Sequence, residues 1–98
     1  MPDFPSSRRE IAGVPIQQLS EQFGTPTFAY IGETIVQRIR DLAAFDTVRY
    51  AQKACSNLAI LDLVRQHGVL VDAVSAGEIH RAMLAGYAVV GDPQPIVY

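Results

Sequence analysis

The chain has 98 residues, of which 49% are hydrophobic and 18% are charged, a balance that excludes a disordered polypeptide and predicts a packed core. The formal net charge is -2 and the arginines are scattered along the chain, so the basic patch of a nucleic-acid-binding protein is missing. No run approaches the roughly 18 apolar residues of a membrane span, and the single cysteine can form no disulfide within the chain. We therefore expect a cytoplasmic protein with neither nucleic acid nor membrane as a partner.

The first third of the chain predicts a leading helix, a strand and a second helix. Apolar residues recur at helical spacing between Pro15 and Gly24, so residues 16–23 should form a helix that ends at the glycine. Residues 25–31 are rich in β-branched and aromatic side chains, which favours a strand. One apolar stripe follows the 3.6-residue period through residues 33–44 and predicts an amphipathic helix.

Strand and helix patterns then alternate to the end of the sequence. Strands are predicted at residues 47–54, 69–74 and 96–98, and helices at residues 58–67 and 79–84. This order indicates parallel βα units joined by right-handed crossovers. Because three open strands leave an apolar edge unpaired and a closed (β/α)8 barrel needs roughly 250 residues, we expect an α/β fold that is part of a barrel, in a piece of a longer protein.

The only lysine, Lys53, lies at the end of the strand predicted at residues 47–54. A lysine buried there favours the neutral amine, the nucleophile that condenses with a carbonyl group to form a Schiff base. A lysine at a strand end that extends its ammonium group into solvent explains the same position without chemistry. The pattern alone leaves both interpretations open.

Two carboxylates follow the next predicted strand, and both have a structural explanation. Asp72 can start a turn at the end of the strand, while Ser75 and Glu78 have the spacing of a capping box that satisfies exposed helix amides. His67 suits the negative end of a helix dipole, and His80 is attributed to surface or packing. No cluster of residues at ligand spacing predicts a metal site.

Further motifs occupy residues 23–30, 50–57 and 72–78. They read Phe-Gly-Thr-Pro-Thr-Phe-Ala-Tyr, Tyr-Ala-Gln-Lys-Ala-Cys-Ser-Asn and Asp-Ala-Val-Ser-Ala-Gly-Glu. In this order they resemble the motifs of the alanine-racemase-like, fold-type III pyridoxal-phosphate decarboxylases, in which the second motif carries the cofactor lysine. The residues after Lys53 favour decarboxylases over racemases, and the segment that ends at Gly86 is most similar to the diaminopimelate decarboxylase branch.

The resemblance implies a pyridoxal 5'-phosphate-binding TIM barrel. Residues 32–98 are then its first βα units, and residues 1–31 form a helix and strand that pack on a C-terminal β domain. The implied activity is decarboxylation of a small amino acid, in that branch the conversion of meso-diaminopimelate to L-lysine and CO2 in lysine biosynthesis. The family commonly forms homodimers.

The resemblance also implies a set of site residues. Lys53 holds the cofactor as a Schiff base at the carboxyl end of the first barrel strand and assists proton transfer, so it is the expected catalytic residue. Ala51, Asp72 and Glu78 are expected beside the cofactor. The phosphate loop, the partner of the pyridine nitrogen and the substrate-binding residues are expected outside this chain, so the chain alone should be inactive.

Other interpretations stay open at this point. Ornithine, arginine and carboxynorspermidine decarboxylases belong to the same family and share its motifs. A small carrier of pyridoxal phosphate would need a complete barrel and a phosphate loop, which a chain of 98 residues cannot hold. An inert fragment is the remaining alternative.

Overall fold

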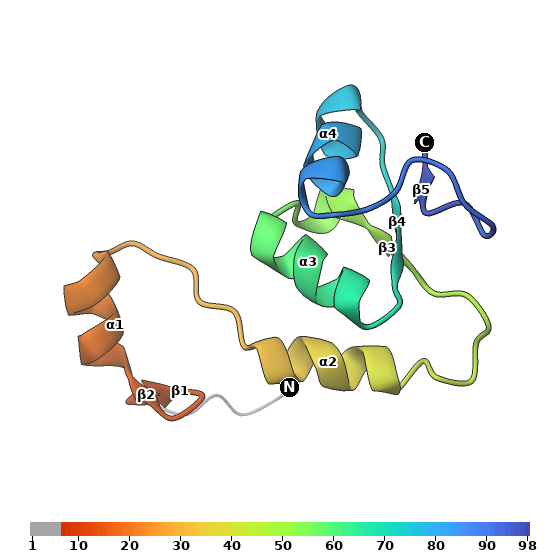
Figure 1. Ribbon diagram of the computed structural model, residues 1–98. Coiled ribbons are helices and arrows are strands. Elements are labelled where there is room, and N and C mark those ends of the chain that lie inside the picture. Colours follow the sequence, from red (N-terminus) through yellow and green to blue (C-terminus); the bar gives the residue numbers. More distant parts are fainter. Residues whose placement is uncertain (1–6) are drawn as a thin grey trace. The chain divides into compact units, whose positions relative to one another are not determined.

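The computed structural model describes residues 7–98, which fall into two compact units divided after Ile31. In the first unit, two short strands form an antiparallel hairpin and a helix follows directly: β1 (Glu10–Ile11), β2 (Val14–Pro15) and α1 (Ile16–Phe23). The second unit has the order α2 (Gly32–Arg40), β3 (Arg49–Ala51), the 3-10 helix η1 (Gln52–Ala54), α3 (Leu58–Gln66), β4 (Leu70–Asp72), α4 (Ala76–Leu84) and β5 (Ile96–Val97) (Figure 1).

The first unit differs from the sequence prediction on both sides of α1. The β1–β2 hairpin is unexpected, and its two-residue turn places Ala12 (φ 50°) and Gly13 (φ 81°) in the left-handed backbone conformation that tight hairpin turns need. Helix α1 itself is confirmed over the predicted range. The strand predicted at residues 25–31 is wrong, because β propensity yields a strand only where the backbone finds a partner, and no described strand pairs with this segment.

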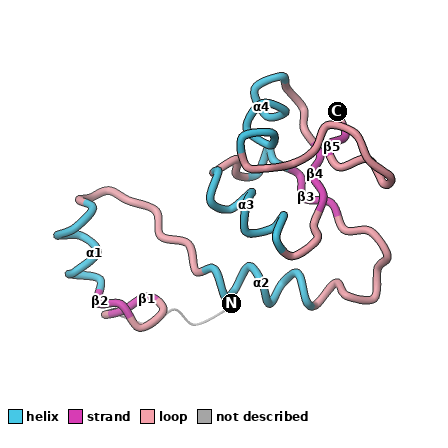
Figure 2. The backbone as a smooth tube through the Cα atoms, viewed as in Figure 1, coloured by secondary structure: helices cyan, strands magenta, loops and turns pink. Residues whose placement is uncertain are grey.

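The second unit contains the predicted parallel sheet, in the order β3-β4-β5. Figure 2 shows one helix between successive strands, α3 after β3 and α4 after β4. Tyr50 lies opposite Val71, and Ala51 lies opposite Asp72. Each strand is shorter than predicted, at three residues in β3, three in β4 and two in β5.

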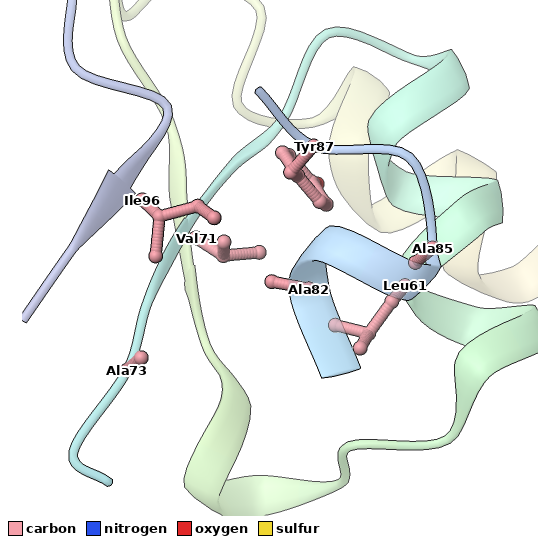
Figure 3. Close-up of a cluster of buried hydrophobic side chains, with 7 residues drawn as sticks. All are labelled: Leu61, Val71, Ala73, Ala82, Ala85, Tyr87 and Ile96. Carbon is pink, nitrogen blue, oxygen red and sulfur yellow. The ribbon is translucent and has the colours of Figure 1, made fainter. Parts of the chain in front are cut away.

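Helices α3 and α4 cover one face of this sheet. Figure 3 shows Val71 and Ile96 pointing from the strands toward Ala82 of α4. Because side chains alternate between the faces of a strand, the neighbouring Leu70 and Asp72 point to the opposite face. The buried core consists of Leu61, Val71, Ala73, Ala82, Ala85, Tyr87 and Ile96, and a second cluster of Ile60, Val64 and Val69 packs against α2 through Ile35 and Ile39.

Capping side chains explain where the helices begin. The Asn57 Oδ1 atom accepts hydrogen bonds from the backbone N–H groups of Ala59 at 2.9 Å and Ile60 at 3.2 Å, so α3 begins where predicted. Ser75 caps α4, which therefore starts three residues before the predicted position 79. Helix α2 ends at Arg40 instead of residue 44, because the backbone continues in tighter turns.

Candidate functional site

Lys53 lies on a turn at the carboxyl end of β3 and not within the strand. The 3-10 helix η1 begins directly after Ala51, and Lys53 at its centre is exposed. Of the two interpretations that the pattern leaves open, the exposed side chain fits the solvent-facing amine and not the buried one. An exposed amine at this position is accessible to a dissolved carbonyl compound.

Asp72 ends β4 opposite Ala51 and is paired with Arg49. The Arg49 Nη1 atom lies 3.9 Å from Asp72 Oδ1, and Arg49 Nη2 donates a hydrogen bond of 2.7 Å to the backbone oxygen of Gln94. The guanidinium group thus connects β3 with β4 and with the segment before β5. Nη1 and Oδ1 are both buried and have no hydrogen-bond partner within the described part of the chain.

Sequence reasoning missed Arg49. Its position beside Asp72 follows from the strand register, in which Arg49 lies opposite Leu70, two residues before the aspartate. The residues next to Arg49 and Asp72 in the sequence do not indicate that the two side chains lie close together. The signal that was available is a charged residue inside a segment predicted to be a strand, where a charge is expected only with a partner.

Gln52 is a second buried polar group, adjacent to Lys53 in the sequence. Its side chain is 1% exposed, and within residues 7–98 neither its Oε1 nor its Nε2 atom has a hydrogen-bond partner. Burying such a group without a partner costs about 1–3 kcal/mol. In the described part of the chain, Gln52 therefore places two buried polar atoms without hydrogen-bond partners at the carboxyl end of β3, and sequence reasoning missed this residue.

Glu78 closes the amino end of α4. Its Oε1 atom accepts a hydrogen bond from the Val74 backbone N–H at 3.3 Å, its Oε2 atom lies 3.5 Å from Ser75 Oγ, and its own N–H donates to that oxygen at 3.1 Å. This geometry confirms the capping interpretation. Contact of Glu78 with a cofactor stays a prediction.

Two side chains hold the turn that carries Lys53. The Tyr50 Oη atom donates a hydrogen bond of 2.6 Å to the backbone oxygen of Cys55, and Arg81 Nε donates one of 2.7 Å to the backbone oxygen of Ser56. Tyr50 belongs to β3 and Arg81 to α4. The segment after the lysine is therefore fixed from the strand and from a neighbouring helix.

The two histidines are the remaining candidate residues. His67 ends α3, where its Nδ1 atom lies 3.0 Å from the backbone oxygen of Leu63, and His80 is exposed on α4. Within residues 7–98, no three histidine, cysteine, aspartate or glutamate side chains are grouped as a metal site. The same residues include no helix long and apolar enough to cross a membrane.

The site combines an accessible amine and a carboxylate at the carboxyl edge of a parallel sheet, the edge at which barrel enzymes place their active sites. A guanidinium group reaches this carboxylate from Arg49, the first residue of β3. A primary amine forms a covalent bond with an aldehyde. Within residues 7–98, buried polar atoms of Arg49, Gln52 and Asp72 have no hydrogen-bond partner, and such atoms suit a polar ligand. These residues fit the aldehyde end of pyridoxal phosphate.

Several known proteins are similar to this chain. Residues 33–98 match the family described as "Pyridoxal-dependent decarboxylase, pyridoxal binding domain". The diaminopimelate decarboxylase of Streptomyces coelicolor is 48% identical over 103 aligned residues, covering 99% of this chain and 23% of the relative. That of Escherichia coli K12 is 44% identical over 93 residues, covering 95% of this chain and 22% of the relative.

A solved structure described as "Crystal structure of diaminopimelate decarboxylase" has the same fold over 83% of this chain and 19% of its own, with a TM-score of 0.79 and 49% sequence identity. The match confirms the predicted α/β fold as part of a TIM-type barrel. The chain spans about a fifth of the length of these relatives.

Proposed function

Because the chain belongs to the pyridoxal-dependent decarboxylase family, through that family's pyridoxal-binding domain, we propose that it forms the first βα units of a diaminopimelate decarboxylase. The intact protein converts meso-diaminopimelate to L-lysine and CO2. The observation that carries this proposal is the identity of 48% and 44% to decarboxylases of this one specificity, over 99% and 95% of the chain.

The family's cofactor is pyridoxal phosphate, which when bound accepts the electron pair left behind as the α-carboxylate departs. We assign the binding of its aldehyde carbon to Lys53 Nζ, which also holds a proton near the reacting carbon. We assign Asp72 a place beside the cofactor, because it puts a carboxylate at the same edge of the sheet. Its ion pair with Arg49 holds that carboxylate in position. Ala51 is small and exposed and leaves space for the ring, while Glu78 holds the start of α4 at the cofactor's edge.

We propose the following organisation of the intact protein. Residues 1–31 pack on a C-terminal β domain and residues 32–98 belong to the barrel; the division of the structure after Ile31 supports this boundary. The protein is a homodimer, as the family resemblance implies. We place it in the cytoplasm, which the presence of only one cysteine supports.

Release of CO2 from different amino acids tests the proposed specificity. The intact protein, supplied with pyridoxal phosphate, should release CO2 from meso-diaminopimelate at least roughly tenfold faster than from ornithine or arginine. The reason is that a site built to hydrogen-bond a polar group of its substrate rejects substrates that lack that group. A faster reaction with ornithine, arginine or carboxynorspermidine would reassign the branch of the family. No release from any of the four would refute the enzymatic proposal.

A further inference from the structure

The geometry points to Tyr50 and Arg81 as positioning residues that fix the turn around Lys53, so that the amine meets the cofactor aldehyde in the correct orientation. This inference rests on the proposed function, which assigns the aldehyde to Lys53. Neither side chain needs to contact the cofactor. Both act through the backbone that carries the lysine.

Tyr50 closes the turn from the strand side. Its ring packs against both hydrophobic clusters, and its Oη atom donates to the backbone oxygen of Cys55 at 2.6 Å. The hydrogen bond therefore joins Tyr50, two residues before the 3-10 helix, to Cys55, directly after it. Lys53 lies between them, in a loop whose two ends are held together.

Arg81 holds the same turn from α4. Helical side chains point back toward the amino end of their helix, which directs Arg81 toward the carboxyl edge of the sheet. Its Nε atom donates to the backbone oxygen of Ser56 at 2.7 Å, across 25 positions of sequence. A hydrogen bond from a guanidinium group is charge-assisted and stronger than a neutral one.

The turn needs such support because of its own geometry. A 3-10 helix has poorer hydrogen bonds than an α-helix and is stable only in short runs. The Lys53 side chain extends from this turn, so the position of the turn decides which positions Nζ can reach. Misplacing a reacting group by about 1 Å can cost up to roughly a hundredfold in rate.

The chain offers a matched control for each residue. Tyr87 Oη donates to the backbone oxygen of Val69, and Arg65 Nε donates to that of Ala85 at 3.0 Å. These bonds have the same chemistry but hold the turn after α4, away from Lys53. The test therefore compares Tyr50→Phe and Arg81→Met with Tyr87→Phe and Arg65→Met in the intact protein, at a temperature where all are folded.

The first readout is the rate at which pyridoxal phosphate labels Lys53. Labelling joins Nζ to the aldehyde carbon with loss of one water, borohydride then delivers hydride to that carbon, and peptide mapping locates the product. Tyr50→Phe and Arg81→Met should lower the rate at saturating cofactor roughly tenfold, with the half-saturating concentration unchanged. The second readout is amide hydrogen exchange without cofactor, which should become faster at residues 52–57 in these two variants only.

Equal labelling rates in Tyr50→Phe, Arg81→Met and the wild type would overturn the inference. So would an equal loss in the two controls, since that result indicates general destabilisation and not positioning. If the wild-type protein fails to label at Lys53, the proposed function is wrong. The exchange data then decide separately whether Tyr50 and Arg81 hold the turn: faster exchange at residues 52–57 supports this, and unchanged exchange refutes it.

Discussion

The turn after β3 and the turn after α4 lie at opposite ends of the parallel sheet, and each is held by one tyrosine and one arginine that donate to backbone carbonyls. Tyr50 and Arg81 hold the first turn, which exposes Lys53. Tyr87 and Arg65 hold the second turn, where the tyrosine is 7% exposed and belongs to the core. In barrel enzymes the carboxyl end of the sheet carries the chemistry and the amino end contributes stability, so the same hydrogen bonds should have different consequences at the two ends.

The largest expected effect is a loss of activity at the carboxyl end. Lys53→Arg keeps the positive charge but removes the primary amine, so CO2 release should fall by about 10³-fold. Because Lys53 is exposed, the free energy of unfolding should change by less than about 0.5 kcal/mol. Steady-state assays and urea unfolding of the same preparation of the intact protein measure both quantities. An active Lys53→Arg protein would contradict the assignment of the chemistry to the carboxyl end of the sheet.

Gly86→Ala should have the opposite profile. Gly86 has φ 110°, and a Cβ atom there would lie 2.8 Å from Arg65 Nε and 3.0 Å from Arg65 Cζ. Strain and contact together should lower the free energy of unfolding by about 1–3 kcal/mol, while the rate of Lys53 labelling stays as in the wild type. Gly77→Ala is the matched control, because its Cβ would meet only Ser75 Oγ at 3.8 Å; an equal loss of stability there would contradict the explanation.

Alkaline pH should lower the free energy of unfolding through Tyr87, at the amino end of the sheet. Burial raises the pKa of Tyr87 from 10.0 to about 12. Since the folded pKa lies above the unfolded one, the stabilisation is complete below pH 10 and is lost as the pH rises toward about 12, by up to about 2 kcal/mol. Urea unfolding between these pH values measures the slope, and Tyr87→Phe should reduce it; an unchanged slope would exclude Tyr87 as its source.

The smallest expected effect concerns Asp62, on the surface beside Arg65. A hydrogen bond from the Arg65 side chain, with Nη2 2.7 Å from Asp62 Oδ1, holds the pKa of Asp62 below its usual value of 3.8. The stabilisation is therefore present above the unfolded pKa and is lost as the pH falls through the lower, folded one. Asp62→Asn should be slightly less stable than the wild type at neutral pH, and the difference should vanish in acid; a difference that persists in acid would have another cause.

Local signals in the sequence predicted much of the second unit. Asn57 and Ser75 cap the helices that follow them, and the alternation of strands with helices predicted the parallel sheet. The strand predicted at residues 25–31 failed because pairing depends on a partner that propensity does not supply. The carboxyl boundary of β3 was also wrong, because a 3-10 turn begins at Gln52 whereas the predicted strand continued to residue 54.

The candidate site was predicted only in part. Lys53 and Asp72 were named as candidates because they stand in motifs that resemble a known family, and their roles stay predictions. Tyr50 and Arg81 were not assigned a role, because their partners are backbone carbonyls, which every residue possesses and which leave no mark in a sequence. Arg49 required the strand register, a property of the folded sheet.

Peptide mapping of the intact protein, incubated with pyridoxal phosphate and reduced with borohydride, locates the amine that binds the cofactor. The reduced pyridoxyl group should be found on Lys53, in the peptide that contains residues 50–57, and its amount should rise with the rate of CO2 release. An active protein that carries the group on a different residue, with Lys53 unmodified, would contradict this prediction.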